Sequence, residues 1–145
     1  MMSDPFNLQR FVEAQSPVFE EVCAELQAGR KVGHWMWFIF PQLKGLGSSA
    51  MADYYGIASK AEAEAYFRHP ILGPRLVECI RLANLSGRSS QQIFGSVDTL
   101  KFRSCLTLFW KVAPHENAFK DALDRYFGSE PDALTIEKLS LSERD

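Results

Sequence analysis

The chain has 145 residues, of which 46% are hydrophobic, 23% charged and 12% aromatic. These values are typical of one globular domain with a large apolar core and exclude a disordered chain. The formal net charge of −2 argues against a protein that binds nucleic acid or an anionic membrane, because lysine and arginine supply most of the affinity for such polyanions.

The lack of a recognisable targeting signal and the spacing of the cysteines indicate where the protein resides. No apolar run approaches the roughly 18 residues that a membrane span needs, and the first residues lack the basic start and apolar run of a signal peptide. Cys23, Cys79 and Cys105 are widely spaced among apolar neighbours, which suits reduced, buried thiols rather than a disulfide framework. We therefore expect a soluble, cytoplasmic protein with a single domain over residues 1–145.

Helix start signals mark the first part of the chain. Asp4-Pro5 is a cap followed by proline at the first helical position, and apolar residues then recur at helical spacing, which predicts a helix over residues 4–15. Ser16-Pro17 repeats this signal and opens a second predicted helix, which continues up to Gly29.

The aromatic segment 35–40 (WMWFIF) follows. Every position is apolar, so periodicity cannot decide between a strand and a helix. No second alternating segment occurs that could pair with a strand, and we therefore predict a short buried helix that ends at Pro41. After the loop 42–48, Ser48 or Ser49 can cap another short helix.

The second half of the chain contains further helix signals. Ser89 with Gln92 forms a capping box, which we assign to a short turn that ends at Gly95. Residues 97–112 contain no helix breaker and are apolar on nearly all sides, which is typical of a central, buried helix. The other predicted helices cover residues 59–68, 73–86, 118–127 and 132–139.

Seven to nine helices without a clear strand or repeat predict an all-α fold, a single multihelical domain around the central helix. We expect its core to cover about residues 4–139 and the tail 140–145 to fray.

The central helix carries Asp98 and Lys101 one turn apart and beside Cys105. Burying such charges costs roughly several kcal/mol each unless they are paired, so they form either a structural ion pair or part of a site. Ser104 and Thr107 could add hydroxyl groups there, or each could bond back to its own helix.

Polar residues also flank the aromatic segment. His34 could act as a general acid or base, or it could be a packed histidine. Trp35 and Trp37 could stack on a base or sugar, or they could pack in the core. Lys44 precedes the glycine-rich sequence 45–49, which could hold a phosphate or carboxylate, or could simply connect two helices.

Arg75 lies in the first turn of a predicted helix, where the helix dipole does not favour a cation. It could bind an anion, pair with a carboxylate such as Asp98, or be solvated. No spacing of histidine, cysteine and carboxylate residues suggests a metal, and no cofactor motif occurs, so we expect neither.

Four blocks of the sequence carry a family resemblance. They are residues 33–42 (GHWMWFIFPQ), 45–47 (GLG), 69–76 (HPILGPRL), and Phe94-Gly95 with Asp98, Lys101, Ser104, Thr107, Leu108 and Phe109. In these blocks the chain resembles the domain-of-unknown-function 1810 family, over about residues 4–139. The resemblance implies a mainly helical fold without an established activity. Some members carry the name calpastatin, but such an inhibitor would be an extended, disordered chain with repeats, which this chain is not.

One hypothesis and one alternative follow. We expect a polar pocket between residues 34–47 and the helix with Asp98 and Lys101, which binds a small anionic or nucleotide-like ligand. Lysine and arginine side chains would meet the anion, Trp37 would stack on the ligand, and His34 with Asp98 would be the acid and base if a substrate is turned over. The expected ligand-binding residues are Trp37, Gln42, Lys44, Arg75, Lys101, Ser104 and Thr107.

The alternative is a non-catalytic module for protein interaction or homodimer formation, in which the aromatic segment is part of the interface. An exposed tryptophan patch, with Asp98 and Lys101 sealed in the core, would favour this alternative.

Overall fold

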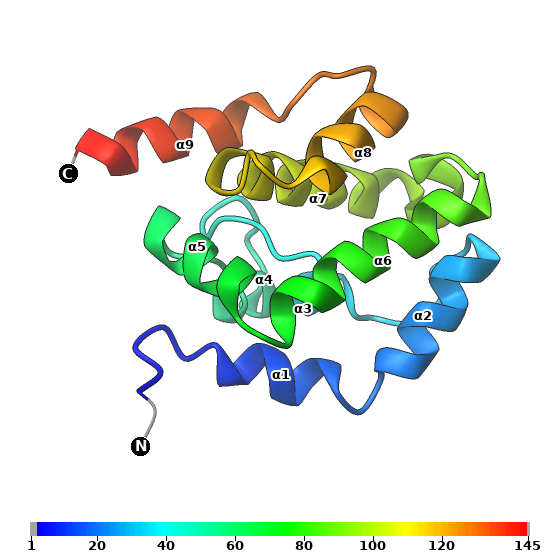
Figure 1. Cartoon of the computed structure of the whole chain (residues 1–145), viewed down its shortest axis with the longest axis horizontal. Helices are drawn as coiled ribbons and strands as arrows, with labels where there is room; N and C mark the ends of the chain where they lie inside the picture. The colour runs from blue at the N-terminus through cyan, green and yellow to red at the C-terminus, as the bar shows by residue number, and fades with distance from the viewer. Residues whose placement is uncertain (1–2, 145) are drawn as a thin grey trace.

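The computed structural model describes residues 3–144, and these contain nine α-helices (Figure 1). No β-strand occurs in these residues, so the all-α prediction is confirmed. In chain order the helices are α1 (Gln9–Gln15), α2 (Phe19–Ala28), α3 (Met36–Ile39), α4 (Ala50–Tyr54), α5 (Lys60–Arg68), α6 (Leu72–Ser86), α7 (Ser90–Val112), α8 (Asn117–Phe127) and α9 (Ala133–Arg144).

The helix α7 lies in the middle of the fold. It packs against α5, α8 and α9, while α6 packs against α2, α5 and α8. Figure 1 shows α8 and α9 along one side of α7, and α1 and α2 at the opposite edge of the molecule. None of the helices in residues 3–144 has the length and the apolar character that crossing a membrane requires.

The helix α7 is longer than predicted and is bent near its start. The capping box is present, since Ser89 Oγ accepts a hydrogen bond from the Gln92 N–H at 3.1 Å and Gln92 Oε1 accepts one from the Ser89 N–H at 3.0 Å. Gly95 then adopts a φ of 81°, which glycine reaches without steric penalty. The turn and the helix that we predicted separately are therefore one kinked element.

The apolar side chains of α7 are more deeply buried in its second half than in the turns after Gly95. Phe102 and Phe109 have no exposed surface, whereas Val97 is 67% exposed and Leu100 61% exposed. The prediction that this helix is buried on nearly all sides is therefore wrong for its first turns. The physical reason is that Val97 and Leu100 line an open groove instead of packing against another helix.

The aromatic segment forms the short buried helix α3, as predicted. Directly after it, Phe40 packs against α7, with its ring centre 5.0 Å from that of Phe102 and 5.7 Å from that of Phe94, both in edge-to-face geometry. Because such pairs are favourable beyond the area that they bury, these contacts fix α3 against the central helix.

The two ends of the chain differ from the predicted boundaries. Asp4 does not cap a helix at residue 5; its carboxylate instead accepts hydrogen bonds from the N–H groups of Leu8 and Gln9, at 2.8 and 2.9 Å. Asn7, with a positive φ of 52°, interrupts the helical backbone in between. At the other end α9 continues to Arg144, beyond the expected end at residue 139, and Asp145 lies outside the described residues.

A buried ion pair that the sequence analysis did not single out joins α1 to α5. The Arg10 guanidinium lies 2.9 Å from the Glu62 carboxylate, and it also donates to the carbonyl oxygens of Phe6, Asn7, Tyr54 and Gly56. Every nitrogen of this side chain therefore has a partner, which is the condition under which a buried charge is tolerated.

All three cysteines are free thiols. Cys79 on α6 and Cys105 on α7 are buried, as predicted, whereas Cys23 on α2 is only partly buried. A hydrogen bond with the Cys79 thiol lowers the pKa of Cys23 to about 7.

Candidate functional site

Asp98 on α7 lies between two lysines that each contact a tryptophan. One carboxylate oxygen is 2.9 Å from the Lys31 Nζ, and the other is 3.4 Å from the Lys101 Nζ. The Lys31 ammonium is 5.3 Å from the centre of the Trp35 ring, and the Lys101 ammonium is 5.2 Å from that of Trp37. One negative charge therefore holds two cation–π pairs together, and links the segment before α3 to the central helix.

Glu25, at the end of α2, holds the loop that carries this cluster. Its Oε1 accepts hydrogen bonds from the N–H groups of Val32 and Gly33 and from the Trp35 Nε1, at 2.6, 2.9 and 2.9 Å. Burial raises the pKa of Glu25, but the bonds from Gly33, Val32 and Trp35 outweigh this and lower the pKa overall. A side chain at Gly33 would also approach the Trp35 ring to 2.8 Å, so glycine is needed there.

A narrow recess lies beside the cluster. It has a volume of about 10 Å³, room for little more than one water-sized group. Trp37 is one of its walls, and the Trp37 Nε1 is buried without a hydrogen-bond partner in the described part of the chain. The recess is lined by Met36, Trp37, Phe40, Gln42, Ala52, Tyr55, Gly56 and Lys101.

A wider groove of about 290 Å³ is next to the recess. Gln42 and Lys101 belong to the walls of both, so they mark the boundary between them. Three apolar side chains at the groove are well exposed: Val97, Leu100 and Leu134, the last at 58%. The groove is lined by Gln42, Leu46, Gly47, Val97, Leu100, Lys101, Ser104, Asp132 and Leu134.

The structure brings part of the expected site together. Trp37, Gln42, Lys101 and Ser104 line the recess or the groove, and Asp98 contacts Lys101. The Ser104 hydroxyl donates to the Leu100 carbonyl at 3.1 Å, which is the helix back-bond that the sequence analysis considered.

Thr107 contributes to the fold rather than to the groove. Its hydroxyl donates to the Arg103 carbonyl and accepts from the Asp132 N–H, both at 2.8 Å. This fixes the chain before α9 against α7.

Two further expected residues, His34 and Lys44, lie outside the cluster. His34 is exposed, and its imidazole makes no hydrogen bond or ion pair within residues 3–144. Lys44 is exposed and faces Asp53 at 3.8 Å. Neither lines the recess or the groove.

Arg75 does not pair with Asp98, the partner that we considered from the sequence. Its Nη1 lies 3.3 Å from the Gln15 Oε1 and 3.4 Å from the Ser16 Oγ, and its guanidinium covers the Phe19 ring at 4.7 Å. It therefore joins α6 to the turn between α1 and α2, because its helix begins on that side of the molecule.

Sequence reasoning missed Lys31, Glu25 and Tyr55. Lys31 stands directly before the aromatic segment, so its position was a usable signal for a cation–π partner. Glu25 had no such signal, since its bonds depend on the loop folding back over the end of α2. No group of three or more His, Cys, Asp or Glu side chains in the described residues could hold a metal ion.

A comparison with models of known protein families places the chain. The chain belongs to the family described as "Protein of unknown function (DUF1810)", whose model matches residues 5–139. The resemblance seen in the sequence is therefore confirmed.

A solved structure shares this fold. It is the crystal structure of the conserved hypothetical protein Rv1873 from Mycobacterium tuberculosis, which is 52% identical and superimposes with a TM-score of 0.92, over 94% of this chain and 99% of that chain. No match was found among curated proteins.

Proposed function

We propose that the groove beside Lys101 binds a small anionic ligand that also has an apolar or planar part, as a nucleotide-like molecule does. The observation that carries this proposal is the position of Lys101. Its side chain lines both the recess and the groove, and its contact with Asp98 is the longer of the two that this carboxylate makes.

The local charge supports an anionic ligand. Asp98 is the one carboxylate that forms an ion pair with Lys31 and Lys101 in the described residues, so the two lysines carry one positive charge more than this partner. The Asp132 carboxylate also lines the groove, and its Oδ2 accepts hydrogen bonds from the N–H and the hydroxyl of Thr135. Lys31 has the shorter contact and can hold Asp98 alone. Lys101 is therefore free to turn toward an anion at a small loss of pairing energy, since it is 23% exposed.

The walls support a ligand with an apolar part. Tyr55 lines the recess, and Leu46, Val97, Leu100 and Leu134 line the groove, next to the amide of Gln42. Apolar walls with a few polar groups are the common composition of small-molecule sites. Because the Lys101 ammonium already covers one face of Trp37, we assign Trp37 the role of positioning Lys101 rather than of stacking on the ligand.

We assign the groove to binding rather than to catalysis. His34 is exposed and lines neither cavity, and Asp98 is held between two ammonium groups. A carboxylate in that position is suited to hold charge in place, and a general base would need a free path to its substrate.

A second candidate function rests on a different observation. Val97, Leu100 and Leu134 are apolar and exposed, so the groove could be covered by a second copy of the chain. None of Trp35, Trp37 and Trp110 is exposed, however, so the tryptophan patch that would favour this alternative is missing. Sedimentation at increasing concentration, with Leu100→Gln as the variant, tests it. A dimer that this substitution dissociates would establish the alternative.

The proposed ligand site is tested by thermal unfolding in the presence of nucleotides, sugar phosphates and other anionic metabolites. A ligand at about 100 times its Kd stabilises the native state by about 2.7 kcal/mol, which raises Tm by several degrees. We expect such a shift for the wild type and its loss in Lys101→Met. Lys120→Met is the matched control, because Lys120 is a helical lysine that pairs with Asp124 on α8.

A ligand that stabilises the wild type and Lys101→Met equally would contradict this assignment. So would the absence of any shift across a broad set of anions.

A further inference from the structure

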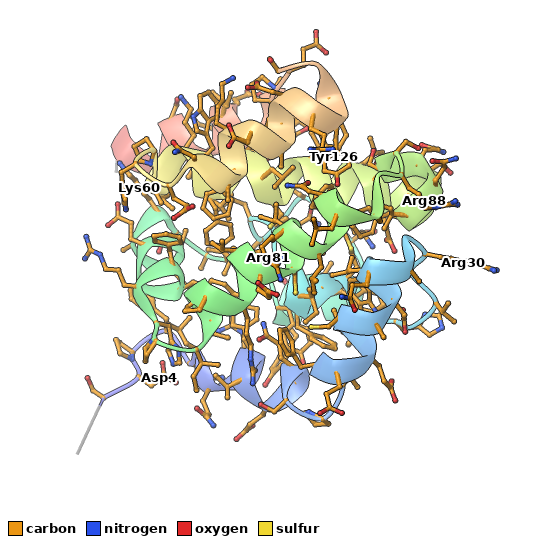
Figure 2. The ribbon with its side chains drawn as sticks, turned by 45° about the vertical axis from the view of Figure 1, so that its right-hand side comes forward. Asp4, Arg30, Lys60, Arg81, Arg88 and Tyr126 are labelled. Atoms are coloured by element: carbon orange, nitrogen blue, oxygen red, sulfur yellow. The ribbon has the colours of Figure 1, made fainter. Side chains whose placement is uncertain are left out.

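A third cavity, a pocket, lies where the turn between α6 and α7 meets the end of α8. It has a volume of about 310 Å³ and shares no residue with the groove or the recess. Figure 2 labels two of its residues, Arg88 and Tyr126, in the upper right of the molecule. The pocket is lined by Gly87, Arg88, Ser89, Ser90, Arg125 and Tyr126.

The pocket is positively charged. Neither Arg88 nor Arg125 forms an ion pair with any residue in 3–144, and no acidic side chain lines the pocket. The neighbouring carboxylate of Asp124 is bound instead by Lys120 and by the Ser129 hydroxyl. Two guanidinium groups are thus left without a negative partner, at the wall of one cavity.

The Arg88 side chain is held in place before any ligand binds. Its Nε donates to the Gly29 carbonyl at 2.9 Å, and its stem packs directly on Gly29, where an added Cβ would lie 2.2 Å from the Arg88 Cδ. The two terminal nitrogens make no hydrogen bond within the described residues. They form a pair of donors with fixed geometry, which suits two oxygens of an anion.

Two residues that line the pocket have hydroxyl groups without a hydrogen-bond partner. Ser90 is only 7% exposed, and its hydroxyl makes no hydrogen bond in residues 3–144. The Tyr126 hydroxyl is buried and unpartnered as well. Burial raises the pKa of Tyr126 to about 12, so this hydroxyl keeps its proton at neutral pH and can donate a hydrogen bond.

We propose that this pocket binds a phosphate group, either inorganic phosphate or the phosphate of a small monoester. Arg88 and Arg125 would balance its charge, and the Ser90 and Tyr126 hydroxyls would donate to its remaining oxygens. A phosphate carries up to two charges and four oxygens, whereas a carboxylate has one charge and two oxygens in a plane. The number of free donors therefore favours phosphate.

Calorimetric titration of the full chain with inorganic phosphate at low salt tests the proposal. We expect saturable binding to the wild type. Arg125→Gln should weaken it by about tenfold, through the loss of one charge-assisted contact, and Ser90→Ala by a smaller factor. Arg125 is exposed, so its replacement should leave the fold and Tm unchanged. Arg125→Lys should restore part of the affinity, because the charge returns without the planar pair of donors.

Two further arms complete the experiment. Lys101→Met should bind phosphate as the wild type does, which separates this pocket from the groove proposed above. Phenyl phosphate, titrated in parallel, identifies the source, since tighter binding than inorganic phosphate indicates a phosphorylated molecule and equal or weaker binding indicates the free ion. No binding of either probe, or equal binding by the wild type and Arg125→Gln, would overturn the proposal.

Discussion

The Lys31 ammonium lies 2.9 Å from the Asp98 carboxylate and thereby ties the segment before α3 to the central helix α7. Both side chains are mostly buried, at 12% and 18% exposure, and Lys101 is a second, longer partner of Asp98. Because the sharing is unequal, loss of the Asp98 carboxylate and loss of the Lys101 ammonium should differ in their effect on stability.

We predict that Asp98→Asn destabilises the protein more than Lys101→Met does. Removal of the carboxylate leaves Lys31 buried without its partner, which should cost about 1–3 kcal/mol, whereas removal of Lys101 leaves the shorter pair intact and should cost less than about 1 kcal/mol. Urea denaturation of both variants measures the difference. A loss of stability in Lys101→Met that matches or exceeds the loss in Asp98→Asn would show that Lys101 is structural.

The buried pair of Arg10 and Glu62 should be among the most sensitive positions of the fold. Arg10→Met leaves the Glu62 carboxylate buried beside an apolar side chain, and we expect a loss of about 3–5 kcal/mol. The double variant Arg10→Met with Glu62→Leu should lose less unfolding free energy than the sum of the losses in the two single variants. Additive losses in this double-mutant cycle would mean that the two side chains do not interact.

Glu25 should make stability depend on pH in the acidic range. Its pKa is lower in the folded protein than in the unfolded chain, so its contribution is fully present above the unfolded value, about 4.3. The contribution is lost as the pH falls from there through the lower folded value. Denaturation midpoints of the wild type should therefore fall more steeply below about pH 4 than those of Glu25→Gln. If the denaturation midpoints of the two proteins fell in parallel with pH, the lowered pKa of Glu25 in the folded protein would be contradicted.

Gly29 and Gly87 offer a matched pair of substitutions. Both end a helix with a positive φ, 75° and 71°, so alanine at either position should cost about 1 kcal/mol in backbone strain. A Cβ at Gly29 also collides with the Arg88 side chain, whereas nothing lies within 4 Å of one at Gly87. We therefore expect Gly29→Ala to be the more destabilising of the two. The combination with Arg88→Ala should remove the difference, and a difference that persists would show that Arg88 is not its cause.

Cys23 should be the most reactive of the three thiols. It is the least buried, and its pKa is lowered to about 7 by the hydrogen bond with the Cys79 thiol, while burial holds the pKa of Cys105 well above its usual range. Iodoacetamide at neutral pH should modify Cys23 first. When the pH is varied, the rate of this modification should reach half of its maximum near pH 7. Cys79→Ala should shift this midpoint upward. An unchanged midpoint would mean that the Cys79 thiol does not stabilise the thiolate.

The sequence alone determined the fold class and most helices. Capping residues and glycines act over one turn of chain, so the starts at Ser59 and Ser89 and the end at Gly29 could be predicted from their neighbours. The start of the first helix was predicted too early, because the positive φ of Asn7 is a backbone conformation that a capping pattern does not predict.

Part of the candidate site could be found in the same way. Trp37, Gln42, Asp98 and Lys101 stood out because polar and aromatic residues met in apolar surroundings, and the structure brings them to one recess or into contact with it.

Only the tertiary structure decided which charged groups meet. Lys31 reaches Asp98 across 67 positions of the sequence, Arg10 reaches Glu62 across 52, and Arg75 turns away from Asp98 to residues near α1. Such pairings depend on how the helices pack, and helix packing is set by the summed burial of many apolar side chains rather than by the local pattern around any one charge.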